Sequence, residues 1–382
     1  MKIGIDIRNI GKKRTGDEVV FFNLVKNLTF INSRNEYFLF TDITDTVVLR
    51  NMVMKPLGIE NRSNFKIVSL KAANKFIWNS WTLPRYLRRH PVDVYHTQYI
   101  TPFFVPKKIK IITTIHDISF NFFPQLIKFS DLFFLKILIP LSLKRANKII
   151  AVSHFTKDEI VKYYKINPEK IETVHNSVDD DFLRNDPSPE ELEKVRKKYS
   201  LPAKFMLYIG TMQPRKNLPF LIKGYSEIKH KLPDIKLVIA GNREARNFDA
   251  KIDEVLKKCD NKQDVIFPGF IDEKDKPALF QLAHLFVFPS LYEGFGIPVL
   301  EAMSRNVPVL VSDIPSAREV AGESAFYFNP FDLDDFSKKL YDVSVDERLR
   351  AELRTKGAKR FRDFSWKDAA LNVLKIYQKL AS

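Results

Sequence analysis

The 382-residue sequence contains a single cysteine, Cys259, and it lacks the short motifs that mark several common kinds of site. One thiol excludes an intrachain disulfide and fits a reducing compartment. Neither half of the chain opens with the Gly-x-Gly-x-x-Gly fingerprint of dinucleotide binding, and no Gly-x-x-x-x-Gly-Lys-Ser/Thr loop occurs. His-Glu-x-x-His and paired cysteines, which hold zinc in many enzymes, are missing too. We therefore expect no bound cofactor and no metal.

Long apolar runs are also scarce. The longest, residues 132–143, is interrupted by Lys136 and Pro140 and falls short of the roughly 20 apolar residues that a spanning helix needs. Near the N-terminus, Asp6 and Arg8 interrupt any apolar core of a signal peptide, and the first residues predict a β-strand instead. We expect a cytoplasmic protein, or one bound peripherally to the inner face of a membrane.

Acidic residues are fewer than basic ones, 46 against 62, which gives a net charge of +16. Residues 1–180 hold 28 basic and 16 acidic residues (+12), leaving 34 and 30 (+4) for the rest. No acid occurs between Glu60 and Asp93. The segment Lys71–Arg89 predicts a basic amphipathic helix that contacts an anionic membrane surface, with packing of its aromatic side chains on a sheet as the alternative. Its basic and aromatic residues are Lys71, Lys75, Phe76, Trp78, Trp81, Arg85, Arg88 and Arg89.

Short β-branched or apolar runs alternate with amphipathic stretches along the chain. Such alternation predicts parallel sheets covered by helices on both faces, an α/β fold. The predicted strands are residues 2–7, 37–40, 65–69, 92–96, 109–115 and 148–152, and then 205–209, 236–240, 265–267, 285–288, 308–311 and 325–328. A charged, proline-containing linker, residues 179–201, separates the two sets. We expect two Rossmann-like domains, the first over residues 1–180.

The segment 288–302 carries the most chemistry. An apolar strand is followed by a loop with Glu293, Gly294 and Gly296, and a proline stands where a helix begins. Such a turn offers backbone N–H groups to an anion, and glycines let a ligand approach the backbone closely. Glu301 lies just over one turn into the helix. Both glutamates can then face one crevice at the carboxyl ends of the strands.

Two further segments place polar residues at strand ends. Gly210 closes one strand, and the neighbouring Arg215 and Lys216 precede a helix that starts near Asn217. An arginine fork beside a lysine suits a diphosphate, although simple solvation is the alternative. In the first half, His116 follows an apolar strand; it is either structural or a group on the acceptor side of a cleft.

These segments together resemble glycosyltransferase family 4, whose members have the GT-B architecture of two Rossmann-like domains facing across a cleft. The similarity covers nearly the whole chain, and the two-glutamate signature is its most specific part. The matching segments are 114–117, 151–156, 210–217, 268–270, 293–301 and 364–366. The resemblance implies a nucleotide-sugar domain over residues 181–363 and a C-terminal helix, 364–382, that returns to the acceptor-binding N-terminal domain.

The resemblance also implies roles for single residues. Glu301 would bind the ribose hydroxyls, Arg215 and Lys216 would hold the diphosphate, and Glu293 would face the donor sugar. Backbone groups near the sugar and phosphates are expected at Gly210, Gly294, Phe295, Gly296 and Ile297. The implied reaction is metal-independent sugar transfer with retention, to a saccharide or lipid-linked acceptor of glycan or cell-envelope polysaccharide synthesis.

In the N-terminal half, His116 would sit near the donor sugar and the acceptor, and Gly16 would lie in a loop that approaches the phosphates. Many relatives have a second glycine where this chain has Glu18, an acid that fits poorly beside a diphosphate. The loop then takes another shape, or Glu18 faces the acceptor. A second departure is Asn176-Ser177, where relatives have Asn-Gly.

The overall pattern looks closest to bacterial mannosyltransferases that use GDP-mannose, with UDP-sugars open. A sugar-nucleotide epimerase on the same architecture is the rival enzyme, although it would not carry the glutamate spacing together with Arg215 and Lys216. A basic RNA-binding protein is disfavoured because the aromatic residues lie mostly in apolar runs instead of alternating with basic ones. We expect those aromatic residues, Phe120, Phe122, Phe123, Phe133 and Phe134 among them, to be core.

Overall fold

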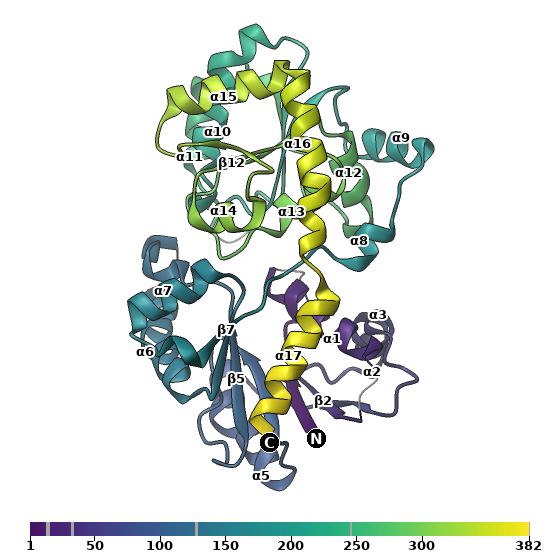
Figure 1. Ribbon diagram of the computed structural model, residues 1–382, viewed down its shortest axis with the longest axis vertical. Helices are drawn as coiled ribbons and strands as arrows, with labels where there is room; N and C mark the ends of the chain where they lie inside the picture. Colours follow the sequence, from purple (N-terminus) through teal and green to yellow (C-terminus); the bar gives the residue numbers. More distant parts are fainter. Residues whose placement is uncertain (13–15, 32–33, 127–128, 245–246, 382) are drawn as a thin grey trace. The chain divides into compact units, whose positions relative to one another are not determined.

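The computed structural model describes residues 1–12, 16–31, 34–126, 129–244 and 247–381. The chain divides into two compact units. The first comprises Met1–Ile118, Phe129–Asn176 and Ser365–Ser382, and the second comprises Ser119–Lys128 and Ser177–Phe364. Each unit has a parallel sheet with helices on both faces, which confirms the predicted α/β class (Figure 1).

The described residues of the first unit form seven strands, all paired in parallel in the order β3-β2-β1-β4-β5-β6-β7. The strands are β1 (Lys2–Asp6), β2 (Glu36–Thr41), β3 (Phe65–Ser69), β4 (Val94–Gln98), β5 (Lys110–Ile115), β6 (Lys148–Ala151) and β7 (Ile171–Thr173). The helices are α1 (Gly16–Phe30), α2 (Thr46–Leu49), α3 (Lys55–Leu57), α4 (Lys75–Ile77), α5 (Leu83–Arg89), α6 (Phe129–Arg145), α7 (His154–Tyr164) and α17 (Trp366–Ala381). A π-helical turn, Trp78–Thr82, joins α4 to α5.

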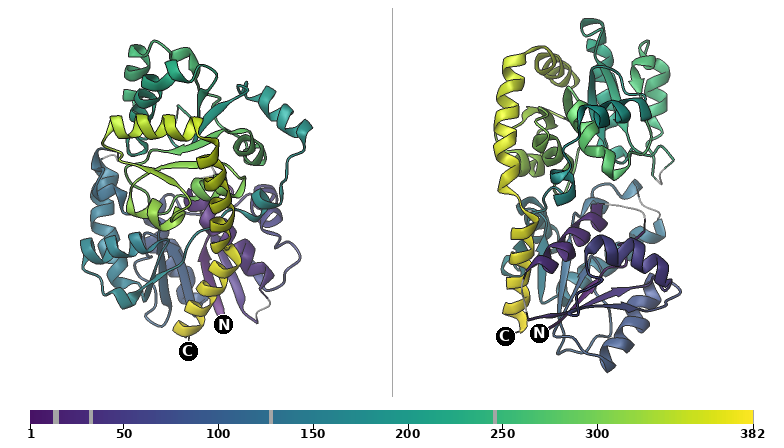
Figure 2. Two further views of the ribbon diagram at one scale, coloured as in Figure 1. Left: turned by 45° about the horizontal axis from the view of Figure 1, so that its top comes forward. Right: turned by 90° about the vertical axis from the view of Figure 1, so that its right-hand side faces the viewer.

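Each face of this sheet has its own core. On one face α17 packs beside α1, with Phe21, Trp366 and Tyr377 buried in one cluster. Figure 2 shows α17, in yellow, running along the first unit to the C-terminus. On the other face α5 covers a cluster that includes Trp78 and Tyr95. The buried strands need this double cover because both of their faces carry apolar side chains.

The second unit repeats the plan with six described strands in the order β10-β9-β8-β11-β12-β13, again all parallel. The strands are β8 (Phe205–Ile209), β9 (Lys236–Ala240), β10 (Val265–Ile266), β11 (Leu285–Phe288), β12 (Val309–Ser312) and β13 (Phe326–Phe328). The helices are α8 (Asp180–Arg184), α9 (Pro189–Lys198), α10 (Leu218–Ile228), α11 (Lys251–Lys258), α12 (Lys276–Leu282), α13 (Ile297–Ser304), α14 (Pro315–Ala321), α15 (Leu333–Val345) and α16 (Glu347–Arg360).

The division between the units differs from the expected boundary at residues 180 and 181. Asn176 ends the main part of the first unit, and the segment Ser119–Lys128 groups with the second. The reason is aromatic packing within the second unit: the Phe122 and Phe123 rings lie 5.3 and 6.2 Å from the ring of Tyr292. In the part of the chain that the structure describes, no helix is both long and apolar enough to cross a bilayer.

The expectation that the phenylalanines of this region form core is partly wrong. Phe120 is buried, but Phe122, Phe133 and Phe134 are exposed. Their apolar sequence context is the same, so the difference arises from which side of each helix or turn meets the sheet.

Candidate active site

Both sheets have a point where the strand order reverses, and the second unit places most of the predicted site residues there. Strand β8 pairs with β9 on one side and with β11 on the other. Crossovers leave the two sides in opposite directions, and the carboxyl ends of the strands at such a reversal are where ligands of open α/β sheets bind. Gly210 directly follows β8, and the Glu293 loop follows β11.

Glycines shape the carboxyl edge of this sheet. Gly210 adopts φ +156° and its N–H donates to the carbonyl of Ala240, 3.0 Å away. Gly241, at the end of the neighbouring strand, adopts φ +152°, and a Cβ there would lie 2.1 Å from the Gly210 carbonyl oxygen. Only glycine fits so close an approach of two backbones. Gly241 was not singled out from the sequence, although its place after a predicted strand matches that of Gly210.

The two predicted cations are held by one carboxylate. Arg215 Nη1 donates to Glu293 Oε2 at 3.0 Å and to the carbonyl of Tyr292 at 3.1 Å. Lys216 Nζ donates to the other oxygen of Glu293 and lies 5.7 Å from the centroid of the Phe288 ring. Arg215 is anchored further because its carbonyl accepts the N–H of Leu291 at 2.8 Å. The cluster of Arg215, Lys216 and Glu293 therefore carries one net positive charge.

Burial and the two cations shift the pKa of Glu293 in opposite directions. Burial of the side chain raises the pKa of its carboxyl, but Lys216 and Arg215 outweigh that penalty and lower the pKa to about 2. The carboxylate thus stays ionised at neutral pH and occupies the position in which an anionic ligand could meet the same two cations. Sequence patterns predicted all three residues at the site but not this pairing.

The low pKa predicts a measurable acid sensitivity. The unfolded chain takes up the Glu293 proton near 4.5 and the folded chain near 2, so the stabilisation present above pH 4.5 is lost as the pH falls. We expect the free energy of unfolding of the wild type, minus that of Glu293→Gln, to fall by about 1.4 kcal/mol per pH unit below that value. Urea unfolding of both proteins over a pH series measures the difference. A difference that is independent of pH would contradict the pairing.

The loop after β11 ends in a helix N-terminus. Gly296 adopts φ +113° and caps α13, which begins at Ile297, one residue before the proline that marked the helix start in the sequence. Among the described residues no side chain caps this end. Pro298 has no N–H and the N–H of Val299 donates to the Gly296 carbonyl at 3.0 Å, so this helix end offers an anion its positive dipole end and not a row of N–H groups. The Phe295 ring is buried and contacts Phe364, 5.5 Å between centroids, which anchors the loop. Glu301 follows on α13 and is nearly buried.

His116 and Gly16 belong to the first unit. His116, after β5, is largely buried, with Nε2 within hydrogen-bond distance of Gln98 Oε1 (2.8 Å) and 3.9 Å from Asp17 Oδ1. Gly16 is the first residue of α1, and a Cβ there would have no described atom within 4 Å. Packing against the described atoms therefore does not require a glycine at position 16. Thr15, in the same predicted loop, lies outside the described residues.

Glu18, the first departure from the family pattern, lies in α1 of the first unit. Its side chain is buried, and Oε1 accepts the backbone N–H of Gly11 at 3.1 Å. Gly11 adopts φ +80°, and a Cβ there would lie 2.9 Å from Val53. The Glu18 carboxylate is therefore tied to the backbone at Gly11. In the second departure, the hydroxyl of Ser177 donates to the carbonyl of Phe364 at 2.9 Å.

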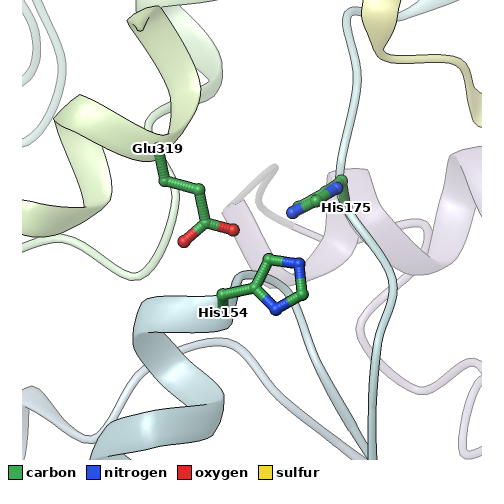
Figure 3. A group of neighbouring side chains, drawn as sticks. All are labelled: His154, His175 and Glu319. Atoms are coloured by element: carbon green, nitrogen blue, oxygen red, sulfur yellow. The ribbon is translucent and has the colours of Figure 1, made fainter.

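The first unit also contains two groups that sequence patterns did not reveal. At its own strand reversal, between β1 and β4, Arg8 donates to both oxygens of Asp6 and lies 4.6 Å from the Trp78 ring. The rings of His154 and His175 lie 5.4 Å apart (Figure 3). Glu319, also labelled there, is part of α14 in the second unit. Trp78 is distant from Arg8 in the sequence, as His175 is from His154, so only the fold of the first unit brings each pair together.

Known families match both halves of the chain. Residues 190–360 match the family model for glycosyl transferases group 1, and residues 18–182 match the model for glycosyltransferase family 4. An O-antigen chain mannosyltransferase B of Escherichia coli is 30% identical over 300 residues, which cover 77% of this chain and 76% of the relative. The chain belongs to glycosyltransferase family 4.

This glycosyltransferase is also similar to a second curated relative and to solved structures. An O-antigen chain mannosyltransferase of Salmonella typhimurium is 32% identical over 231 residues, 60% of each chain, so the match spans only three fifths of that relative. Among solved structures, a sucrose-phosphate synthase of Thermosynechococcus elongatus gives a TM-score of 0.78 at 17% identity, covering 100% of this chain and 99% of the other. That likeness shows the GT-B fold, which confirms the predicted architecture.

Proposed function

We propose that this glycosyltransferase transfers mannose from GDP-mannose, with retention at the anomeric carbon, to a saccharide or lipid-linked acceptor in cell-envelope polysaccharide synthesis. The observation that carries the proposal is the cluster of Arg215, Lys216 and Glu293 at the strand reversal of the second unit. Support for mannose comes from the two relatives, both of which are named as mannosyltransferases of O-antigen.

The cluster suggests how the donor is held. A nucleotide diphosphate competes with Glu293 for Arg215 and Lys216, and the displaced carboxylate is then free to meet the donor sugar. As the bond to the sugar breaks, negative charge grows on the leaving diphosphate. Once the donor is bound, the two cations and the N-terminus of α13 stabilise that charge, and Arg215 keeps its hydrogen bond to the Tyr292 carbonyl.

A donor panel tests the proposal. The protein is incubated with GDP-mannose, GDP-fucose, UDP-glucose and UDP-galactose, and thermal stabilisation and products are recorded for each. We expect the largest stabilisation with GDP-mannose, and release of GDP with a mannosylated acceptor whose anomeric configuration matches that of the donor. Stabilisation by a UDP-sugar alone would overturn the donor assignment. Formation of an epimerised sugar nucleotide in place of a glycosylated acceptor would overturn transfer itself.

Transfer is expected to continue without divalent cations. Arg215 and Lys216 supply two positive charges at the diphosphate, the task that a metal ion performs in other transferases. Initial rates in excess EDTA should therefore stay close to those in Mg²⁺ or Mn²⁺. A complete loss of activity in EDTA that added metal restores would contradict charge stabilisation by the two side chains.

We further propose that the segment Lys71–Arg89 binds an anionic membrane surface. The sequence left two alternatives for the aromatic residues of this segment, packing on the sheet and contact with a membrane. Its two tryptophans differ in this respect: Trp78 is buried in the core, whereas Trp81 is 61% exposed. Phe76, in the same segment, is exposed too, and the Arg85 guanidinium lies 6.0 Å from the Trp81 ring. Exposed aromatic rings next to cations suit the interface of an anionic bilayer.

Tryptophan fluorescence tests this second proposal directly. All three tryptophans are described, and only Trp81 is exposed. We expect vesicles that contain phosphatidylglycerol to shift its emission to shorter wavelength and brominated lipid to quench it, with little effect of neutral vesicles. Emission that is the same with and without anionic vesicles would remove the membrane from the proposed function.

A further inference from the structure

Helix α6 of the first unit exposes a row of large apolar side chains. Phe133, Phe134, Ile137 and Leu141 are between 44 and 55% exposed. With 3.6 residues per turn, residues 133, 137 and 141 follow one another along one side of the helix, and residue 134 lies next to them. We call these four residues the α6 row. Single exposed apolar residues are ordinary, but a contiguous row marks a surface that contacts a membrane or a binding partner.

The opposite side of α6 is fixed to the unit, so the row does not result from a loosely packed helix. Ile139, Ser142 and Leu143 are buried. The Ser142 hydroxyl accepts the backbone N–H of Thr101 at 3.0 Å, and Arg145 Nη2 donates to the carbonyl of Val105 at 3.1 Å. The helix is therefore held in one rotational setting, with its apolar row outward.

The same loop that fixes α6 also joins the proposed membrane segment. The N–H of Phe103 donates to the carbonyl of Asn79 at 2.9 Å, and Arg88 Nη2 donates to the carbonyl of Phe104 at 3.3 Å. The rings of Phe76 and Phe103 lie 6.1 Å apart, and Phe104 is 63% exposed. The loop thus carries exposed aromatic surface from α5 toward the C-terminal end of α6.

Topology places the two helices on one face of the sheet. The crossover from β3 through α5 to β4 and the crossover from β5 through α6 to β6 both run toward the β7 edge. Right-handed crossovers that run in the same direction lie on the same face. Figure 1 shows α5 in blue and α6 in teal within the first unit.

The charges beside the row favour an anionic partner. Lys136, Lys144 and Arg145 are exposed on α6, whose sequence contains one acid, Asp131. The Lys71–Arg89 segment adds five basic residues and no acid. A second copy of the chain seated on this face would bring like charges together, which is unfavourable. An anionic bilayer satisfies both the apolar row and the cations.

We propose that α6 is a second membrane-docking element, which inserts the α6 row into the same anionic bilayer that the Lys71–Arg89 segment contacts. The inference rests on the membrane part of the proposed function, and it adds a second apolar anchor on a separate helix. Two weak anchors on one rigid unit bind far more tightly than either alone, because the second binds at high effective concentration.

A tryptophan moved onto α6 tests the proposal. Trp81→Phe removes the exposed tryptophan, and Phe133→Trp in that background places a single exposed indole on the α6 row. A matched control, Phe331→Trp in the same background, places it at a position of the second unit that is 80% exposed. With vesicles of phosphatidylcholine and phosphatidylglycerol, brominated lipid should quench the indole at position 133 about as strongly as Trp81 in the wild type, and should leave the one at 331 unquenched.

A polar variant of the row provides the second measurement. Phe133→Ser, Ile137→Ser and Leu141→Ser together change only exposed positions, so the thermal unfolding midpoint should stay close to that of the wild type. We expect the vesicle partition coefficient to fall about tenfold or more. The control Phe30→Ser, at an exposed position on α1, should not change it.

The outcomes separate this inference from the proposal on which it rests. Quenching of Trp81 without quenching at position 133, or unchanged partitioning of the polar variant, would overturn the role of α6 and leave Lys71–Arg89 as the docking segment. Absence of quenching at both positions would overturn membrane docking altogether. Equal quenching at 133 and 331 would show general adsorption to lipid and would also overturn the proposal.

Discussion

Replacing Arg215 or Lys216 by alanine is expected to lower turnover by about 10²–10³. That is the usual cost of removing one preorganised group that stabilises transition-state charge. Each variant also leaves Glu293 with a single cation, so the net charge of the cluster falls from +1 to zero and the cluster no longer attracts the diphosphate. The loss should appear mainly in kcat, because charge on the leaving group grows as the bond to the sugar breaks. Steady-state rates of GDP release at saturating acceptor measure it.

Two comparisons make this prediction sharper. Lys223→Ala removes an exposed cation from α10 of the same unit and should leave turnover unchanged. Because Arg215 and Lys216 share Glu293, their effects should not add: the double alanine variant should lose less than the product of the two single losses. Wild-type turnover in either single variant would refute the assignment of these cations to the diphosphate.

The strands of both sheets could be predicted from the sequence because their signal is local. Every residue of β8 is buried. Burial on both faces of the sheet requires a continuous apolar run, which can be recognised in the sequence without knowing the neighbouring strands. The same holds for β11, and the loop that follows it was predicted from its glycines and proline. The predicted strand 2–7 extends one residue past β1, where the apolar Ile7 follows the ladder, whereas 308–311 starts and ends one residue before β12.

Partners that lie far apart in sequence could not be predicted in the same way. Glu293 meets Arg215 and Lys216 only because β8 and β11 are neighbours in the sheet although two strands separate them in the chain. Sequence patterns placed all three side chains at carboxyl ends of strands, which is correct, but strand order decides which ends adjoin. The prediction of which phenylalanines are buried was wrong for a related reason. Phe120 and Phe133 lie in similar apolar runs, and only the orientation of each segment against the sheet makes the first buried and the second exposed.

Replacing Glu301 by glutamine or alanine is expected to raise the KM for the donor by about 10–100-fold, with a smaller effect on kcat. A hydrogen bond between a carboxylate and ribose hydroxyls typically contributes about 1.5–3 kcal/mol, which corresponds to that range. The ribose is distant from the bond that breaks, so the interaction should stabilise the bound donor and the transition state alike. Glu323→Gln, an exposed glutamate of the same unit, is the matched control.

A modified donor can assign this effect to the ribose itself. With a 2′-deoxyribose donor, the wild type should lose about as much affinity as Glu301→Ala loses with the natural donor, and the variant should lose little more. If the loss caused by the modified donor and the loss caused by Glu301→Ala multiply when they are combined, Glu301 does not act on the ribose. It then acts elsewhere, for example by fixing the loop from Glu293 to Gly296. In that case kcat should fall with KM, since the same loop carries the carboxylate that holds Arg215 and Lys216. The split between the two constants therefore distinguishes a ribose ligand from a residue that positions the diphosphate site.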